Sequence, residues 1–409
     1  MAHGASSTLV LDNGAFTAKI GIATATRPRI APNCITKAKS ERRRTFVGTQ
    51  IDDCRDLSGL YFVYPHQRGY LVNWDVEKRI WLQLFASGDV TPTSHSFILT
   101  EPCFNFASIQ ESLNEIALEE LQFKSFFRCP APVLSAAAYH RRFPAAVAAC
   151  VIDTGFSFTH VVPTYAGRPI SDAVRRIDVG GKVLTNHLKD IVSYRQLNVM
   201  DETHVINQAK EDVCYVSLDV GADMAVARAR DPRRNTIARD YVLPDFARTR
   251  RGYVRDISSG SATTNPDDQI IRFTNERFSV PELLFSPSDI GIRQCGIPEA
   301  IIHSIAATPE ILHPHLYGNI VLTGGNAALP GFCERVYRDV RALVPAQYDV
   351  GVWLPPDPVT FAWEGGRALV ASGEFERLRV TQRDAKEFGM GACQRRLRLE
   401  ADLTFAQKK

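Results

Sequence analysis

The chain has 409 residues, which is longer than one ordinary domain and predicts two large lobes or more. Its hydrophobic fraction of 45% is typical of a globular protein, and its net charge of +3 is too small to indicate a nucleic-acid binder by itself. Nine cysteines stand singly, no apolar run has the length of a membrane span, and the N-terminal residues lack a secretory signal. These features predict a soluble intracellular protein, cytosolic or nuclear.

The predicted elements alternate between strands and helices along the chain. In order they are a β-hairpin over 9–23, helices over 73–85 and 108–123, a β-hairpin over 150–164, helices over 180–195 and 206–219, and a strand over 319–325. Asn73 or Asp75 is expected to cap the first helix, and Ser108 with Glu111 has the spacing of a capping box at the second. The alternation predicts an α/β protein.

The two predicted hairpins share one sequence pattern. Each has three apolar residues, an Asp, a polar residue and a Gly, followed by a polar side chain seven positions after the Asp. The offset is 141 residues for each of the pairs Asp12 and Asp153, Gly14 and Gly155, and Lys19 and His160. Such a repeat predicts two related lobes that face each other. Turn N–H groups can bind phosphate oxygens and two carboxylates can hold hydrated Mg²⁺, so the repeat predicts a polyphosphate clamp.

Other candidate site residues are less specific. Gly324 and Gly325 follow a predicted strand, and Gly181 opens a predicted helix; both positions suit a nearby nucleoside or phosphate, or else a tight turn. His160 could position or deprotonate an attacking water, or it could be a satisfied histidine at a strand end.

One segment, residues 248–268, differs in composition from the rest of the chain. It is rich in Ser, Thr, Gly, Asn and Arg and has little periodicity, which predicts a long surface insertion. Basic clusters lie at 37–44, at 228–235, within this insertion and at 394–399. They are either solvated faces or contacts to DNA or to an acidic protein.

These loops, together with the runs at 71–75, 100–105, 133–139, 275–285 and 361–366, resemble the actin superfamily over residues 8 to 390. Within it, the runs at 104–116, 193–217 and 285–292 are similar to a nuclear group, the actin-related protein six subfamily. The resemblance implies an α/β fold of two lobes, built from duplicated ribonuclease-H-like domains around a nucleotide cleft. It places residues 1–131 and 361–409 in a small lobe, with an outer subdomain at about 35–71, and residues 132–360 in a large lobe, with an outer subdomain at about 180–292 that contains the insertion 248–268.

The resemblance also implies which residues line the cleft. The first phosphate loop would be Asp12, Asn13, Gly14 and Lys19; the second would be Asp153, Gly155, Thr159 and His160; and the nucleoside side would be Gly181, Lys210, Glu211, Gly324 and Gly325. If a nucleotide is bound, Asp12 and Asp153 would hold its Mg through water.

Several positions depart from the pattern that the family uses for catalysis. In the first loop, Ala15 and Phe16 stand where actin has a serine and a glycine; in the second loop, Phe156 replaces an acid. Ala131 aligns with the glutamine that orients the attacking water. Because such a group contributes about two to four orders of magnitude in rate, the sequence predicts negligible hydrolysis and no enzyme activity.

Three further departures concern binding and assembly. Ser157 replaces a second glycine, and the tyrosine and lysine that bracket the base align with Leu329 and Thr360. The expectation is therefore ATP with Mg retained without turnover, or an empty cleft in which Phe156 and Phe158 hold the lobes shut. The segment between Asn33 and Thr49 is short and highly charged, which argues against a homopolymer.

The function that the resemblance implies is that of a non-catalytic subunit of an SWR-type chromatin remodelling complex, which exchanges a histone for its Z-type variant. The expected partners are the motor subunit, a zinc-finger HIT subunit and the nucleosome with its histones, and the expected location is the nucleus, with some cytoplasmic protein. Two alternatives remain open at this point: an active ATPase or small-molecule kinase of the same fold, and a cytoskeletal filament protein.

Overall fold

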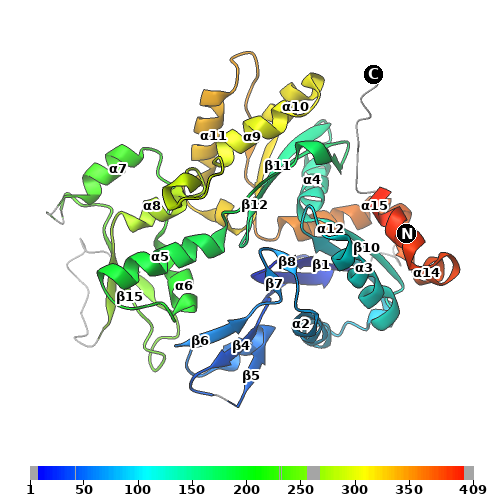
Figure 1. Cartoon of the computed structure of the whole chain (residues 1–409), viewed down its shortest axis with the longest axis horizontal. Helices are drawn as coiled ribbons and strands as arrows, with labels where there is room; N and C mark the ends of the chain where they lie inside the picture. Colours follow the sequence, from blue (N-terminus) through cyan, green and yellow to red (C-terminus); the bar gives the residue numbers. More distant parts are fainter. Residues whose placement is uncertain (1–7, 42, 230, 232, 256–267, 400–409) are drawn as a thin grey trace.

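Two six-stranded sheets form the centre of the molecule (Figure 1). The computed structural model describes residues 8–41, 43–229, 231, 233–255 and 268–399. The first sheet has the order β20 (Val380–Thr381), β10 (Ser125–Pro130), β9 (Ser96–Glu101), β1 (Thr8–Asn13), β2 (Thr17–Ile22) and β3 (Arg29–Pro32). The second sheet has the order β13 (Arg168–Pro169), β12 (Thr159–Tyr165), β11 (Ala148–Thr154), β18 (Ile320–Thr323) and β19 (Val352–Trp353), with β14 (Arg175–Ile177) paired to β12.

The two sheets repeat the same topology, as the duplicated sequence pattern predicts. In each sheet an antiparallel hairpin is followed by two strands that run parallel to its first strand, β9 and β10 in one case and β18 and β19 in the other. The register is also repeated, because Asp12 pairs with Lys19 and Asp153 pairs with His160. This arrangement confirms the predicted actin-like α/β fold of duplicated ribonuclease-H-like domains.

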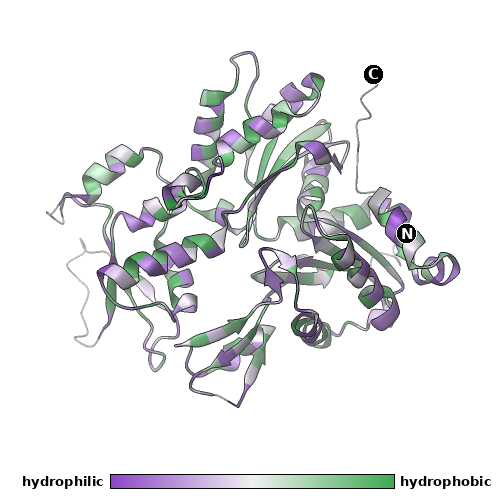
Figure 2. Ribbon diagram, viewed as in Figure 1, coloured by the Kyte–Doolittle hydropathy of each residue, from purple (hydrophilic) through white to green (hydrophobic). Residues whose placement is uncertain are grey.

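Amphipathic helices cover both sheets. In Figure 2 the central strands of the second sheet are mainly green, and the neighbouring helices alternate between green and purple. Residues of α2 (Trp74–Ala86), α3 (Ala107–Glu115), α4 (Ala131–Arg142), α12 (Phe361–Ala371), α13 (Glu374–Leu378), α14 (Gln382–Phe388) and α15 (Met390–Leu399) pack into the core of the first sheet. Residues of α5 (Gly181–Arg195), α6 (Thr203–Val213), α8 (Glu276–Glu282), α9 (Ile297–Ala306), α10 (His313–Gly318) and α11 (Phe332–Leu343) pack into the core of the second, whereas α7 (Val220–Ala227) buries no residue.

Helices α4 and α12 carry the chain between the two sheets and pack against each other. Leu134 and Trp363 belong to the core of the first sheet, whereas Tyr139 and Phe361 belong to a cluster under β11 and β18 of the second. The two lobes are therefore joined by a double connection. The exact lobe boundaries at residues 131 and 360 remain predictions.

The structure also contains two small three-stranded sheets outside the two central sheets. One consists of β4 (Ile35–Ala38), β5 (Thr45–Val47) and β6 (Leu60–Val63), and the other of β15 (Arg239–Val242), β16 (Tyr253–Arg255) and β17 (Ile270–Phe273). A short hairpin, β7 (His66–Gln67) and β8 (Tyr70–Leu71), is drawn between the first of these sheets and β1 (Figure 1). None of the helices in the described ranges combines the length and hydrophobicity that crossing a bilayer needs.

The predicted insertion at 248–268 is partly structured, which corrects the expectation of a plain surface loop. Residues 253–255 form β16, and Arg250 donates to the carbonyl oxygens of Asp52 and Cys54, at the end of the 3₁₀ helix Gly48–Asp53 in the opposite lobe. Residues 256–267 of the predicted insertion lie outside the described part.

Three predicted helix ends can be compared with the structure. Asn73 caps α2 as expected, because its Oδ1 accepts from the Val76 amide at 3.2 Å. The capping box at Ser108 is wrong: the helix begins at Ala107 without a side-chain cap and continues as one π turn over Ile116–Glu120. Helix α6 ends at Val213 rather than at residue 219, because the next amides bond to distant carbonyl groups.

Candidate nucleotide cleft

A cavity of about 540 Å³ lies between the two hairpins, a volume within the usual range of ligand sites. Twelve of the thirteen predicted site residues line it: Asp12, Asn13, Gly14, Lys19, Asp153, Gly155, His160, Gly181, Lys210, Glu211, Gly324 and Gly325. The duplicated fold explains the convergence, because both hairpin turns and the loop after β18 lie at the same end of their sheets.

Thr159 is the predicted site residue that the structure does not bring to the cavity. It is fully buried in the second lobe, and its Oγ1 lies at hydrogen-bond distance, 3.0 Å, from both Thr154 Oγ1 and the Val179 carbonyl oxygen. Because its side chain points into the lobe's interior, its assignment to the phosphate loop is corrected to a structural one.

The first loop holds its charges in a fixed arrangement. Lys19 Nζ lies 3.1 Å from Asp12 Oδ2, and Thr100 donates to Asp12 Oδ1 at 2.8 Å. Thr100 Oγ1 also accepts from the Asn13 amide at 2.8 Å. Asp12 is therefore held by a cation and a hydroxyl, and Lys19 presents a positive charge to the cavity.

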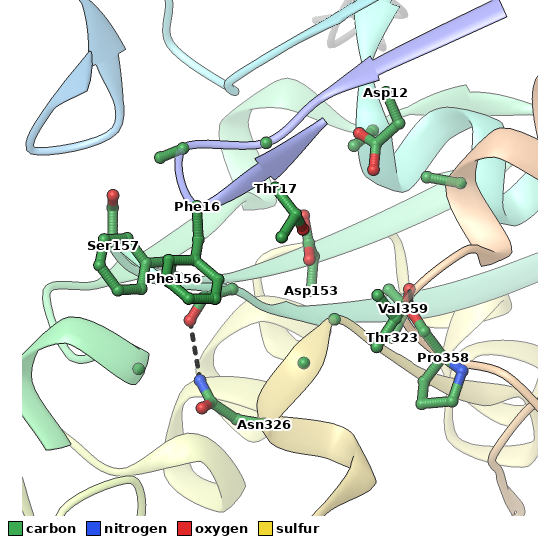
Figure 3. A pocket seen from close by; sticks show the side chains of 18 of the residues that line it. Asp12, Phe16, Thr17, Asp153, Phe156, Ser157, Thr323, Asn326, Pro358 and Val359 are labelled. Atoms are coloured by element: carbon green, nitrogen blue, oxygen red, sulfur yellow. Dashed lines mark hydrogen bonds between the residues drawn. The ribbon is translucent and has the colours of Figure 1, made fainter. Parts of the chain in front are cut away.

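The second carboxylate, Asp153, is half-buried in the cavity wall opposite Asp12 (Figure 3). Its pKa is raised to about 6 by desolvation and by the negative charge of Asp12, while the positive charge of Lys19 lowers it. Two carboxylates with one lysine between them favour a cation, so the pair suits the hydrated Mg²⁺ of a bound nucleotide.

Behind the first loop lies a buried glutamate that the sequence did not single out. Glu77 is fully buried in α2 and accepts from Asn13 Nδ2 at 2.5 Å. Its second oxygen, Oε2, has no hydrogen-bond partner among the described residues. Burial raises the pKa of Glu77 to about 7, and the hydrogen bond from Asn13 opposes this shift.

Glu77 makes stability depend on pH. Because its folded-state pKa of about 7 lies above the ordinary 4.5, the folded chain holds a proton between these pH values that the unfolded chain has released. The free energy of unfolding therefore falls as pH rises through this window, by up to about 3 kcal/mol. We expect Glu77→Gln to remove this dependence and to be the more stable variant at pH 8.

Urea unfolding of both proteins at pH 5 and pH 8 tests the role of Glu77. The exposed Glu115 provides a control, because Glu115→Gln is expected to leave the wild-type pH dependence unchanged. Equal pH dependence in wild type and Glu77→Gln would contradict the prediction.

His160 is neutral in this environment. Its side chain is 1% exposed, and burial together with the nearby Arg176 lowers its pKa to about 3. Its Nε2 has no hydrogen-bond partner in the described part of the chain, and its ring lies 4.2 Å from that of Phe158. Of the two expectations for His160, that of a histidine whose ring nitrogens both have hydrogen-bond partners therefore does not hold for Nε2 among the described residues.

The nucleoside side combines a glycine cradle with a buried lysine. Gly324 has a φ of +91°, and a Cβ there would lie 2.3 Å from the Thr154 carbonyl oxygen, so only glycine fits. Lys210 Nζ lies 3.0 Å from Asn207 Oδ1 and 3.1 Å from Thr185 Oγ1, and burial lowers its pKa. Glu211 accepts from Asn207 Nδ2 at 2.8 Å.

The N-terminal N–H groups of α5 are already used by the second hairpin. Gly181 N donates to the Gly155 carbonyl at 3.0 Å, and Lys182 N donates to the Phe156 carbonyl at 2.8 Å. These bonds hold the hairpin turn against the helix, so these two amides are not free to bind a phosphate.

The substituted positions give the cleft an apolar rim. Ala15 and Ala131 line it with methyl groups, and Leu329 lines it in place of an aromatic ring. The rings of Phe16 and Phe156 stack across it with centroids 4.8 Å apart (Figure 3). Thr360 is not among the described residues that line the cavity. Its hydroxyl donates to Asp357 Oδ2 at 2.7 Å.

Some lining residues were not predicted from the sequence. Thr17 lies beside Asp153 (Figure 3), and Asn326 donates to the Gly155 carbonyl at 2.8 Å. Pro358 and Val359 complete the wall near Thr323. Only their position in the fold identifies them, because none carries a distinctive motif. The cavity thus has the room, the paired carboxylates and the lysine for a nucleotide with Mg²⁺, whereas its groups for activating water are missing.

The duplicated fold and this cleft define an actin-like protein. The sequence matches the actin family over residues 3–398, so the chain belongs to that family. It is 46% identical to "Actin-related protein 6" of Drosophila melanogaster over 96% of this chain and 100% of the relative. It is 39% identical to "Actin-like protein ARP6" of Cryptococcus neoformans, over 95% and 84%, and 36% identical to "Actin-related protein 6" of Arabidopsis thaliana, over 96% and 99%. Within the actin family its similarity is therefore to actin-related protein 6.

Proposed function

We propose that this chain is a non-catalytic, actin-like subunit of an SWR-type ATP-dependent chromatin remodelling complex that exchanges a histone for its Z-type variant. The observation that supports the non-catalytic part is the cleft, which keeps Asp12, Lys19 and Asp153 but has methyl groups at Ala15 and Ala131. The chromatin part rests on the near-full-length similarity to actin-related protein 6. The proposed location is the nucleus, with some cytoplasmic protein.

In this proposal a nucleotide is a structural ligand rather than a substrate. ATP with Mg, bound between Asp12 and Asp153, stabilises the folded chain by mass action and is not turned over. Asp12 and Asp153 would hold the Mg through water, and Lys19 would contact the phosphates. An empty cleft is the alternative; release of nucleotide from the denatured, purified protein distinguishes the two.

The proposed partners are the remodeller motor subunit, a zinc-finger HIT subunit and the nucleosome with its histones, with DNA as a further contact. The described arginines of the insertion are already engaged: Arg248 with Asp245, Arg251 with Asp212 and Arg255 with Asp240. Arg250 bonds to the carbonyl groups of Asp52 and Cys54, at the end of the 3₁₀ helix Gly48–Asp53. We therefore assign partner binding to the polar segment 256–267, which contains no Lys or Arg, and to the basic clusters at 37–44, 228–235 and 394–399, rather than to these arginines.

Replacing residues 256–267 by a Gly-Ser linker tests the role of this segment and leaves β16, Arg250 and Arg251 unchanged in sequence. We expect affinity purification of the tagged variant to recover at least tenfold less motor subunit and zinc-finger HIT subunit than the wild type. A chain with the same segment scrambled is the matched control for length and charge. Wild-type recovery of both subunits by the linker variant would contradict the assignment of this surface.

A further inference from the structure

Three aromatic rings from both lobes meet at the mouth of the cleft. Phe16 lies in the turn between β1 and β2, Phe156 lies in the turn between β11 and β12, and Tyr64 follows β6. The Phe16 and Phe156 rings stack with an interplanar angle of 25°, and the Tyr64 ring lies 5.8 Å from that of Phe156. Phe156 therefore contacts two rings of the opposite lobe.

The stack separates two cavities. On its inner side lies the candidate nucleotide cleft, and on its outer side lies a second cavity of about 540 Å³ between β6 and helices α5 and α6. Phe16, Thr17 and Phe156 line both cavities, as do Asn207 and Glu211. The rings thus form part of the wall between the cleft and the outer cavity.

Other contacts across the cleft are also made by protein groups alone. A Cβ at Gly69, in the β7–β8 hairpin, would lie 1.9 Å from the Phe158 ring, and Arg176 donates to the Arg68 carbonyl at 3.0 Å and to the Tyr70 hydroxyl at 3.1 Å. Farther out, the Gly59 amide donates to both oxygens of Glu202 at 3.1 Å. Each of these contacts joins elements of opposite lobes. Both partners of each contact are protein groups, so the contact forms without a ligand.

Backbone hydrogen bonding positions the turn that carries Phe156. The Phe156 carbonyl accepts from the Lys182 amide at 2.8 Å, and the Lys182 ammonium lies 5.9 Å from the Tyr64 ring. Because the backbone is held in this way, stacking of the ring costs mainly its own side-chain entropy.

We propose that Phe16 and Phe156 form an apolar latch that holds the two lobes together at the mouth of the cleft in the absence of nucleotide. The ring pair takes the bridging role that a polyphosphate between the two hairpins would otherwise have. A ligand reaches the inner cavity by this mouth only when the rings separate. The inference concerns the isolated chain and does not depend on which complex the chain joins.

Amide hydrogen exchange of the nucleotide-free chain tests the latch. The Gly59 amide is the reporter, because its bond to Glu202 joins the residue before β6 to the N-cap of α6 in the opposite lobe and breaks when the lobes separate. In the wild type we expect this amide to be protected without nucleotide, and Mg-ATP to change its exchange rate less than about twofold. In Phe156→Ala we expect exchange at Gly59 to become about tenfold faster.

Phe143→Ala is the matched control, because Phe143 packs against Tyr139 at the same 4.8 Å centroid distance but within one lobe. It should leave exchange at Gly59 unchanged. Phe16→Ala should match Phe156→Ala, and the double variant should add little to either single change, since both remove one interaction. Equal exchange in Phe156→Ala and Phe143→Ala, additive effects of the two latch substitutions, or a wild type that becomes protected only with Mg-ATP would overturn the proposal.

Discussion

Arg128→Met is expected to destabilise the chain by about 3–5 kcal/mol, the cost of leaving a buried charge without its partner. Arg128 and Glu101 form an ion pair with side chains only 2% and 4% exposed. Arg128 also donates to Asn114 Oδ1 at 3.0 Å and to Gln394 Oε1 at 3.1 Å. The side chain thus links β10 to the end of β9 and to helices α3 and α15. Urea unfolding at pH 7 measures the effect.

Two further variants isolate the cause of that loss. Adding Glu101→Gln to Arg128→Met removes the unpaired carboxylate, so it should recover much of the lost stability. Lys78→Met breaks a half-exposed pair with Glu120 and should cost no more than about 1 kcal/mol. A loss in Arg128→Met as small as that in Lys78→Met would contradict the importance of the buried network.

ATP hydrolysis by the purified chain is expected to be slower by about two to four orders of magnitude than in a member of the fold that orients the attacking water. Ala131 has no group that could position that water, and Ala15 has no hydroxyl for a terminal phosphate. His160 is neutral and buried, and its pKa of about 3 makes it a weak base. Asp12 and Lys19 are paired with each other at 3.1 Å, so we expect them, with Asp153, to hold a ligand rather than to activate water.

The repeated hairpins were the part of the fold that could be predicted most directly. The Asp-x-Gly pattern with its constant spacing predicts a hairpin pair, and the structure repeats the pairing register in both lobes. Glycines after a strand likewise predicted residues that line the cavity, because the positive φ of Gly324 leaves a local sequence signal, whereas their contact with a nucleoside stays a prediction. A local sequence pattern is enough to predict the structure where the backbone geometry depends only on residues that are neighbours in the sequence.

Long-range features could not be predicted in this way. The expected capping box at Ser108 failed because tertiary packing begins the helix one residue earlier, without a cap. Nothing near Glu77 in the sequence indicates that it is buried beneath Asn13. The resemblance suggested that Phe156 and Phe158 close the cleft, yet the ring that stacks on Phe156 is Phe16, 140 positions away in the chain. Residues so far apart in the sequence come into contact only because the fold brings the two lobes together.

A single-turnover assay with Mg-ATP on the purified chain tests whether the cleft hydrolyses nucleotide. Protein in excess over labelled ATP is incubated, bound nucleotide is separated from free nucleotide, and the bound fraction is denatured and resolved into ATP and ADP. We expect ATP to be recovered unchanged, and the Asp12→Ala variant to differ only in how much ATP is bound. Formation of ADP by the wild type that is lost in Asp12→Ala would show that the cleft is a working ATPase.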